Sequence, residues 1–153
     1  MKVYFLRHGK ADWPNWDKPD DERPLNKKGR KQMGRVVKFL CNLEPKISLV
    51  LSSPLPRALQ TAEIAADYLG LELEEEPALG KGFDATKLRR ILKERADEEL
   101  MIVGHEPSFS TVIGELTGGR VKLPKAGIAV VDVSDGAREG ELVWLLPPRI
   151  TDS

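Results

Sequence analysis

The two histidines of this chain each stand where an apolar stretch ends. His8 follows residues 3–6 in FLRHG, and His105 follows residues 100–103 in IVGH. Short apolar runs of this kind are typical of buried strands. Because the carboxyl ends of parallel strands meet at one edge of a sheet, we expect both imidazoles to lie on the rim where open α/β sheets bind ligands.

Two arginines extend this group. Arg7 adjoins His8, and Arg57 follows SSPLP in the first turn of an expected helix, where backbone N–H groups and the helix dipole favour an anion. Such cations converging at a helix N-terminus are suited to a phosphoryl group. Neither a Walker-type GxxxxGK[ST] loop nor a GxGxxG loop is present. No Cys/His spacing suggests zinc, so we expect no metal and no cofactor.

The elements that must position these residues alternate along the chain. Strands are predicted at 3–6, 47–52, 71–75 and 100–103, and helices at 26–43, at 55–69, after Asp84 and from Pro107 to Gly118. Final strands at 127–133 and 141–146 can add an antiparallel edge. This alternation predicts one α/β domain over residues 1–153, a three-layer α/β/α sandwich with a mostly parallel central sheet.

Local signals refine two of the helices. Asn26 is a predicted N-cap of the first helix, and Gly70 is a predicted C-cap of the second. The buried stripe of the second helix is expected to contain one alanine pair flanked by leucines, namely Leu55, Leu59, Ala62, Ala66 and Leu69.

Composition excludes several classes of protein. Lys plus Arg and Asp plus Glu both total 24, and this neutral balance gives no support for nucleic-acid or membrane-surface binding. Apolar stretches are too short to span a bilayer, and no charged and then apolar leader opens the chain. The single cysteine, Cys41, lies on an apolar helix stripe, so we expect a small core residue and a reducing cytoplasm.

Residues 10–24 form a polar, proline-rich stretch that is long for a connection in a compact domain. This length favours a functional loop. Trp13 and Trp16 are interpreted as anchors that pack the loop down, with a direct part in substrate binding as the alternative.

Four blocks, RHGKA, ERPLNKKG, SSPLPRALQTA and VGHEPSF, occur in that order. Together they resemble the histidine phosphatase superfamily (phosphoglycerate mutase-like), and in detail its small branch of SixA-type phosphohistidine phosphatases. The resemblance extends to LVWLLPPR near the end of the chain. It implies the histidine phosphatase fold without a cap domain.

The resemblance implies catalytic roles for four matched residues. His8 would be the nucleophile that attacks phosphorus and forms a covalent phosphohistidine intermediate, which water then hydrolyses. Arg7, Arg57 and His105 would bind the phosphoryl oxygens. An imidazole attacks only through an unprotonated nitrogen, so its other nitrogen should donate to a fixed acceptor. The flanking cations should also favour the neutral ring.

Three further residues are predicted to bind the substrate. Gly9 would let the backbone approach the phosphate. Arg23, within ERPL, matches a position near the pocket in small-branch relatives, and an ion pair with Glu22 or Asp21 is the alternative. Glu106 directly follows the second histidine and either points into the site or places a favourable charge at a helix start.

The sequence also bears on which phosphate is cleaved. Small-branch relatives often carry a Glu before the Leu of a triplet after the third strand, but here residues 77–79 read Pro-Ala-Leu. General acid catalysis typically supplies ~10²–10⁴-fold in rate. An imidazole leaving group needs it far less, since its conjugate acid has a pKa of roughly 6.5, against about 15.7 for a water-like hydroxyl. Glu106 or Asp84 as the acid would overturn this argument, whereas Glu76 and Lys125 are expected to be solvated.

These observations favour a metal-independent phosphohistidine phosphatase. Its substrate would be a phosphorylated protein, such as a histidine-containing phosphotransfer domain, and its product phosphate ion. A broad-specificity small-molecule phosphomonoesterase is one alternative. A non-catalytic phosphate- or partner-binding module is another, against which the presence of both histidines and both arginines argues.

Overall fold

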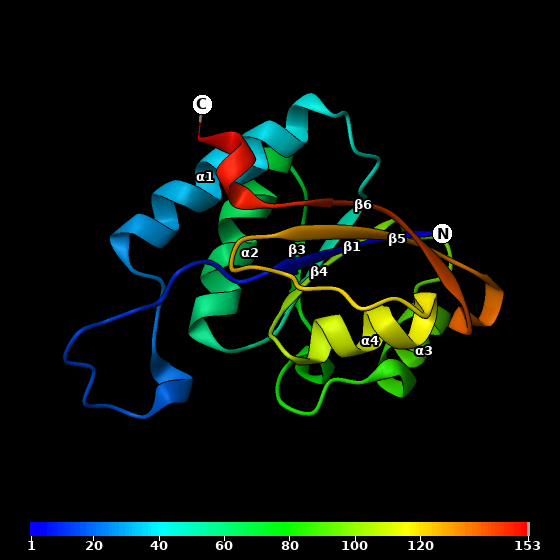
Figure 1. Cartoon of the computed structure of the whole chain (residues 1–153), viewed down its shortest axis with the longest axis horizontal. Helices are drawn as coiled ribbons and strands as arrows, with labels where there is room; N and C mark the ends of the chain where they lie inside the picture. The colour runs from blue at the N-terminus through cyan, green and yellow to red at the C-terminus, as the bar shows by residue number, and fades with distance from the viewer. Residues whose placement is uncertain (153) are drawn as a thin grey trace.

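Six strands form one sheet in the order β3-β2-β4-β1-β5-β6 (Figure 1). The structure, a computed structural model, describes residues 1–152. The strands are β1 (Lys2–Arg7), β2 (Leu49–Ser52), β3 (Leu73–Glu75), β4 (Leu100–Gly104), β5 (Ile128–Val133) and β6 (Gly140–Leu146). The helices are α1 (Lys27–Asn42), α2 (Pro56–Leu69), α3 (Ala85–Glu94) and α4 (Ser108–Thr117).

The sheet is parallel from β3 to β1, and β5 and β6 add an antiparallel edge. Helices α1 and α2 cover one face, and α3 and α4 cover the other (Figure 1). The predicted α/β/α sandwich with a mostly parallel sheet is therefore confirmed. Strands β2 and β3 are shorter than predicted, because pairing begins only at Leu49 and Leu73.

Side chains of the central strands alternate between two cores. In β1, Val3 and Phe5 pack toward α3 and α4, whereas Tyr4 and Leu6 pack toward α1 and α2. Strand β4 alternates in the same way. Strands buried on both faces read as continuous apolar runs, which is the pattern seen in the sequence. The two strands that precede the histidines are thus held from both sides.

The predicted helix caps are confirmed. The Asn26 side chain accepts a hydrogen bond from Gly29 N at 2.7 Å, and Gly70 takes a left-handed conformation with φ 68°. Asp84 caps α3 by accepting from Lys87 N at 2.9 Å. Cys41 is half-buried at the edge of the core, with Sγ 3.7 Å from the Tyr68 carbonyl oxygen.

The predicted stripe of α2 is wrong in its leucines. Leu55, Leu59 and Leu69 are only half-buried. The face that meets the sheet consists of small side chains at helical spacing, namely Ala58, Thr61, Ala62, Ala65 and Ala66. A pattern search weights large apolar residues, whereas here small ones let α2 pack closely on its neighbours.

Within residues 1–152, every helix is too short or too polar to cross a bilayer.

Gly29 tests the packing at the start of α1, and Gly34, further along the same helix, is the control. A Cβ on Gly29 would lie 2.1 Å from the Lys10 carbonyl oxygen, whereas a Cβ on Gly34 would meet the exposed side chain of Tyr68, with the hydroxyl nearest at 3.2 Å. Overpacking against backbone costs about 1–3 kcal/mol, and alanine is favoured over glycine in a helix by up to about 1 kcal/mol. We expect Gly29→Ala to lower the free energy of unfolding and Gly34→Ala to leave it unchanged or raise it. Urea denaturation measures both, and equal effects would contradict this account.

Candidate active site

The pairing of β1 with β4 brings the two histidines together. Arg7 is opposite Gly104 in the parallel register, and the His8 backbone N donates to the Gly104 carbonyl oxygen at 3.1 Å. The two imidazole ring centres are 5.3 Å apart. Since a hydrogen bond spans about 2.7–3.2 Å, both rings can reach one tetrahedral anion between them.

A pocket of about 390 Å³ opens at this carboxyl edge of the sheet, and we refer to it as the two-histidine pocket. Its lining combines both histidines with Arg57 and three carboxylates. The full set is His8, Asp20, Asp21, Leu55, Arg57, Gly80, Lys81, Gly82, His105, Glu106 and Ser108. The pocket is thus lined by basic side chains, imidazoles and carboxylates together.

The His8 ring is fixed in one tautomer. Its Nδ1 lies 2.8 Å from the Gly9 carbonyl oxygen. Because a carbonyl oxygen only accepts, Nδ1 carries the proton and donates, which leaves Nε2 with a free lone pair. Burial lowers the pKa of His8 to about 3, and the charges of Arg57 and Arg7 act in the same direction. The expectation of a neutral ring holds, but desolvation contributes more than the flanking cations.

His105 is also held as a neutral ring. Its Nε2 lies 2.7 Å from the hydroxyl of Ser53, which is fully buried. Burial lowers the pKa of His105 to about 4, with Arg57 as the next cause and Asp21 opposing it.

The two arginines come from different elements. Arg57 lies in the first turn of α2 and is buried. Arg7, at the end of β1, donates from NH1 to the Leu123 carbonyl oxygen at 3.0 Å. It does not line the pocket, but its charge lowers the pKa of both histidines.

Asp20 is a pocket residue that the sequence reasoning missed. Arg57 donates to its backbone carbonyl oxygen at 2.9 Å and lies 3.4 Å from its carboxylate. The same carboxylate accepts from Arg23 Nε at 2.9 Å. The hydrogen bond from Arg23 is the largest cause of a lowered pKa of Asp20. The carboxylate therefore occupies one of the N–H groups of the Arg57 guanidinium.

Arg23 thus reaches the pocket only through Asp20. Its expected alternative partners, Glu22 and Asp21, do not form this pair; Asp21 instead bridges to Lys81 at 2.7 Å. The Asp20–Arg23 spacing of three residues was the available signal, since such neighbours meet in a helical turn. A single turn of 3₁₀ helix at Asp20–Glu22 provides that geometry.

Glu106 combines both of its predicted behaviours. It lines the pocket, yet its carboxylate accepts from the backbone N of Ser110 at 2.7 Å and from the Ser110 hydroxyl. It therefore caps the start of α4.

The other candidate carboxylates and the loop lysine have structural partners. Asp84 is a helix cap, as the leading interpretation stated, and it does not line the pocket. Glu76, expected to be solvated, is half-buried and accepts from Ala78 N at 3.0 Å. Lys125, also expected to be solvated, pairs with Asp12 at 3.1 Å.

Gly9 is packed against α1. Its backbone N donates to the Thr61 hydroxyl at 3.1 Å, and Thr61 in turn donates to the Arg57 carbonyl oxygen at 2.7 Å. A Cβ at Gly9 would lie 3.3 Å from Met33 and 3.4 Å from Leu25. The close approach that glycine permits here is to the helix, and its approach to a phosphate stays a prediction.

The two tryptophans form hydrogen bonds within the loop of residues 10–24. Trp13 donates to the Pro24 carbonyl oxygen at 2.9 Å, and Trp16 donates to that of Pro19 at 3.1 Å. Trp13 remains 42% exposed, and neither tryptophan lines the pocket. These contacts agree with anchors for a loop that carries Asp20 to Arg57.

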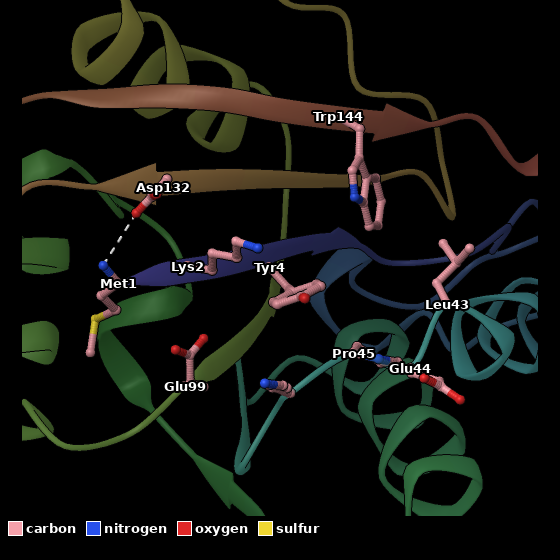
Figure 2. A pocket seen from close by; sticks show the side chains of 10 residues that line it. Met1, Lys2, Tyr4, Leu43, Glu44, Pro45, Glu99, Asp132 and Trp144 are labelled. Atoms are coloured by element: carbon pink, nitrogen blue, oxygen red, sulfur yellow. Dashed lines mark hydrogen bonds and ion pairs between the residues drawn. The ribbon is translucent and has the colours of Figure 1, made fainter.

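A second pocket, of about 450 Å³, lies at the opposite edge of the sheet (Figure 2). Tyr4 and Trp144 pack edge to face there, and Lys2, Glu99 and Asp132 also line the pocket. It contains neither histidine, so it is separate from the two-histidine pocket. Among residues 1–152, no three His, Cys, Asp or Glu side chains are arranged to hold a metal ion.

Comparisons with known proteins agree with this geometry. Residues 3–81 match the family model described as histidine phosphatase superfamily (branch 1). An uncharacterized protein of Picosynechococcus sp. is 35% identical over 171 aligned residues, which cover 97% of this chain and 98% of the relative.

Two solved structures show the same fold. The protein histidine phosphatase SixA complexed with tungstate has a TM-score of 0.87 and 26% identity, over 98% of this chain and 99% of that chain. Phosphoserine phosphatase from Entamoeba histolytica has a TM-score of 0.74 and 17% identity, over 95% of this chain and 96% of that chain.

The chain belongs to the histidine phosphatase superfamily, and it is a phosphatase of that type. Within the superfamily it falls in the small SixA-type branch, whose fold it shares over nearly its whole length without a cap domain.

Removal of the Asp20 carboxylate should strengthen anion binding. The carboxylate competes with an incoming oxyanion for Arg57 and repels it. Exposed ion pairs are weak, so Asp20→Asn should lower the Kd for tungstate by only about two- to fivefold. Isothermal titration measures this. Asp17→Asn removes an exposed carboxylate from the same loop and should have no effect. Weaker binding in Asp20→Asn would show that Asp20 orders Arg57 and does not compete at it.

Stability should fall as pH falls from 7 to 5. The unfolded chain protonates both histidines near their ordinary pKa of about 6.5, whereas the folded chain leaves them neutral down to about 4 and 3. The unfolded state therefore binds more protons, and each histidine contributes a slope approaching about 1.4 kcal/mol per pH unit near pH 5. Urea unfolding in phosphate-free buffer measures the slope. His105→Asn should remove about half of it, and an unchanged slope would be evidence against a buried neutral His105.

Proposed function

We propose that this chain is a phosphohistidine phosphatase that acts on a phosphorylated protein through a covalent phosphohistidine on His8. The observation that carries this proposal is the hydrogen bond from His8 Nδ1 to the Gly9 carbonyl oxygen. It leaves Nε2 unprotonated in a pocket that also contains Arg57 and His105.

In the first step, the Nε2 lone pair of His8 attacks phosphorus, and the bond from phosphorus to the substrate nitrogen breaks. The substrate ring enters protonated on the ring nitrogen that is not bonded to phosphorus, and it leaves as a neutral imidazole that keeps this proton. The new phosphohistidine gains a positive ring charge, and its Nδ1–H remains hydrogen-bonded to Gly9. Arg7, Arg57 and His105 neutralise charge on the phosphoryl oxygens, which is most of what phosphoryl transfer requires.

In the second step, water attacks phosphorus and the bond to His8 Nε2 breaks. The products are free His8 and phosphate ion, with one proton of the water released. The same cations serve both steps, since the phosphoryl group stays in the pocket while His8 Nε2 is the attacking atom in the first step and the leaving atom in the second.

The preference for a P–N bond rests on the absence of a free carboxylic acid. Residues 77–79 supply no carboxylate, and both oxygens of Glu106 are engaged by Ser110. An alkoxide leaving group needs a proton in the transition state, whereas an imidazole whose other ring nitrogen is already protonated does not. The fold itself does not discriminate, because it resembles both a histidine phosphatase and a phosphoserine phosphatase.

The proposed partner is a phosphorylated protein such as a histidine-containing phosphotransfer domain. The similarity to SixA over nearly the whole chain supports this choice. We place the activity in the cytoplasm, because a single cysteine is typical of a reducing compartment.

The proposed function is tested by comparing two substrates. We expect kcat/KM for a phosphohistidine peptide to exceed that for a sugar phosphate by at least about 100-fold, the size of a typical general acid contribution. Rapid acid-free quench with a ³²P-labelled peptide should trap label on wild-type protein and none on His8→Ala. Turnover that survives in His8→Ala would overturn the covalent mechanism.

Glu106→Gln separates this proposal from the phosphomonoesterase alternative. If Glu106 only caps α4, the variant should hydrolyse the phosphohistidine peptide within about threefold of the wild-type rate. If Glu106 is a general acid, the variant should lose sugar phosphate hydrolysis by about 100-fold or more. Wild-type protein that prefers the sugar phosphate would favour the phosphomonoesterase.

A further inference from the structure

Ser53 is a buried hydroxyl group to which neither the sequence motifs nor the proposed steps assign a role. It follows β2, and its backbone N donates to the Val103 carbonyl oxygen at 3.0 Å, so its position is tied to β4. Its side chain has no exposed surface. Its hydroxyl oxygen lies 2.7 Å from His105 Nε2 and 3.3 Å from the backbone N of Leu55.

These contacts determine the direction of the hydrogen bond. A serine hydroxyl has one hydrogen to donate and lone pairs that accept. The Leu55 N–H takes one lone pair. Among the described residues, His105 Nε2 is the acceptor within reach of the hydroxyl hydrogen. If Nε2 carried a proton instead, the hydroxyl hydrogen would be buried without an acceptor, which is costly.

We propose that Ser53 is a positioning residue that holds His105 in the Nδ1–H tautomer, so that this ring offers an N–H donor to the phosphoryl group. His8 takes the same tautomer but presents its other end, because its Nδ1–H is held by Gly9 and its Nε2 lone pair is free. One histidine thus supplies a nucleophile and the other a hydrogen-bond donor, although both rings are neutral. The catalytic consequence rests on the proposed function; the tautomer does not.

The tautomer is read directly by ¹⁵N NMR of histidine-labelled protein near pH 7. The chain has two histidines, so His8→Asn assigns every signal. In wild-type protein we expect His105 Nδ1 to be protonated and Nε2 not. In Ser53→Ala, the Nε2 signal of His105 should shift toward the protonated position. The signals of His8 should stay unchanged, since Gly9 and not Ser53 holds that ring.

Ser52→Ala is the matched control. Ser52 is also fully buried, but its hydroxyl donates to the Ser53 carbonyl oxygen and not to a histidine. It should leave the tautomer of His105 unchanged, whatever it does to stability. Ser53→Thr keeps the hydroxyl group, and Ser53→Val has the shape of threonine without a hydroxyl group. Of these two variants, only the threonine variant should retain the wild-type spectrum. This pair decides the question if Ser53→Ala does not fold.

The kinetic arm uses a phosphohistidine peptide. Removal of one donor that acts on developing charge costs about 10²–10³-fold, and loss of a residue that only orients that donor should cost less, about 10- to 100-fold in kcat. We expect this loss in Ser53→Ala and Ser53→Val, with KM little changed, and recovery of most activity in Ser53→Thr.

The two arms fail separately. If His105 keeps the Nδ1–H form in Ser53→Ala, the assignment of the tautomer to Ser53 is overturned. If the tautomer shifts but that variant turns over at the wild-type rate, the positioning role in catalysis is overturned. If wild-type protein shows the expected tautomers but does not hydrolyse phosphohistidine, the proposed function fails, and the NMR result still supports Ser53 as the residue that sets the tautomer.

Discussion

The two-histidine pocket depends on the alignment of the ends of β1 and β4, which the hydrogen bond from the His8 backbone N to the Gly104 carbonyl oxygen fixes. It continues the parallel ladder of β1 and β4 by one residue beyond the strands, so both histidines leave the sheet at the same level. A slip of one residue in this register would exchange the faces of every side chain in β1 and separate the rings. The two cores that clamp alternate residues of both strands prevent such a slip, because either core would then have to bury misplaced side chains.

Burial, more than the neighbouring charges, keeps the two histidines of the pocket uncharged. Desolvation is the largest cause of the lowered pKa of both histidines, and the arginine charges add to it. A neutral imidazole is needed for attack on phosphorus, so the same burial that costs stability below neutral pH keeps His8, the proposed nucleophile, in its reactive form. Asp20 compensates part of the charge of the Arg57 guanidinium, and it lies in a loop at the pocket rim.

Much of this arrangement could be predicted from the sequence. An apolar run followed by Arg-His-Gly, and another followed by Gly-His, specify two buried strands that end in imidazoles. Capping residues such as Asn26 are local signals with a local mechanism. What could not be predicted depends on contacts distant in sequence. Asp20 meets Arg57 across 37 residues, and Ser53 meets His105 across 52. In α2, alanines displaced the expected leucines because close helix packing, and not hydrophobicity, selects the buried face.

The hydrogen-bond partners of the acidic residues also bear on the choice of leaving group. A general acid must hold a proton near neutral pH and reach the leaving atom. Asp20 has a lowered pKa because Arg23 donates to it, so it stays ionised. Both carboxylate oxygens of Glu106 accept hydrogen bonds from Ser110 at the start of α4, where a negative charge is favoured. A pocket whose carboxylates are engaged in this way is suited to a substrate whose leaving imidazole already carries a proton on its other ring nitrogen.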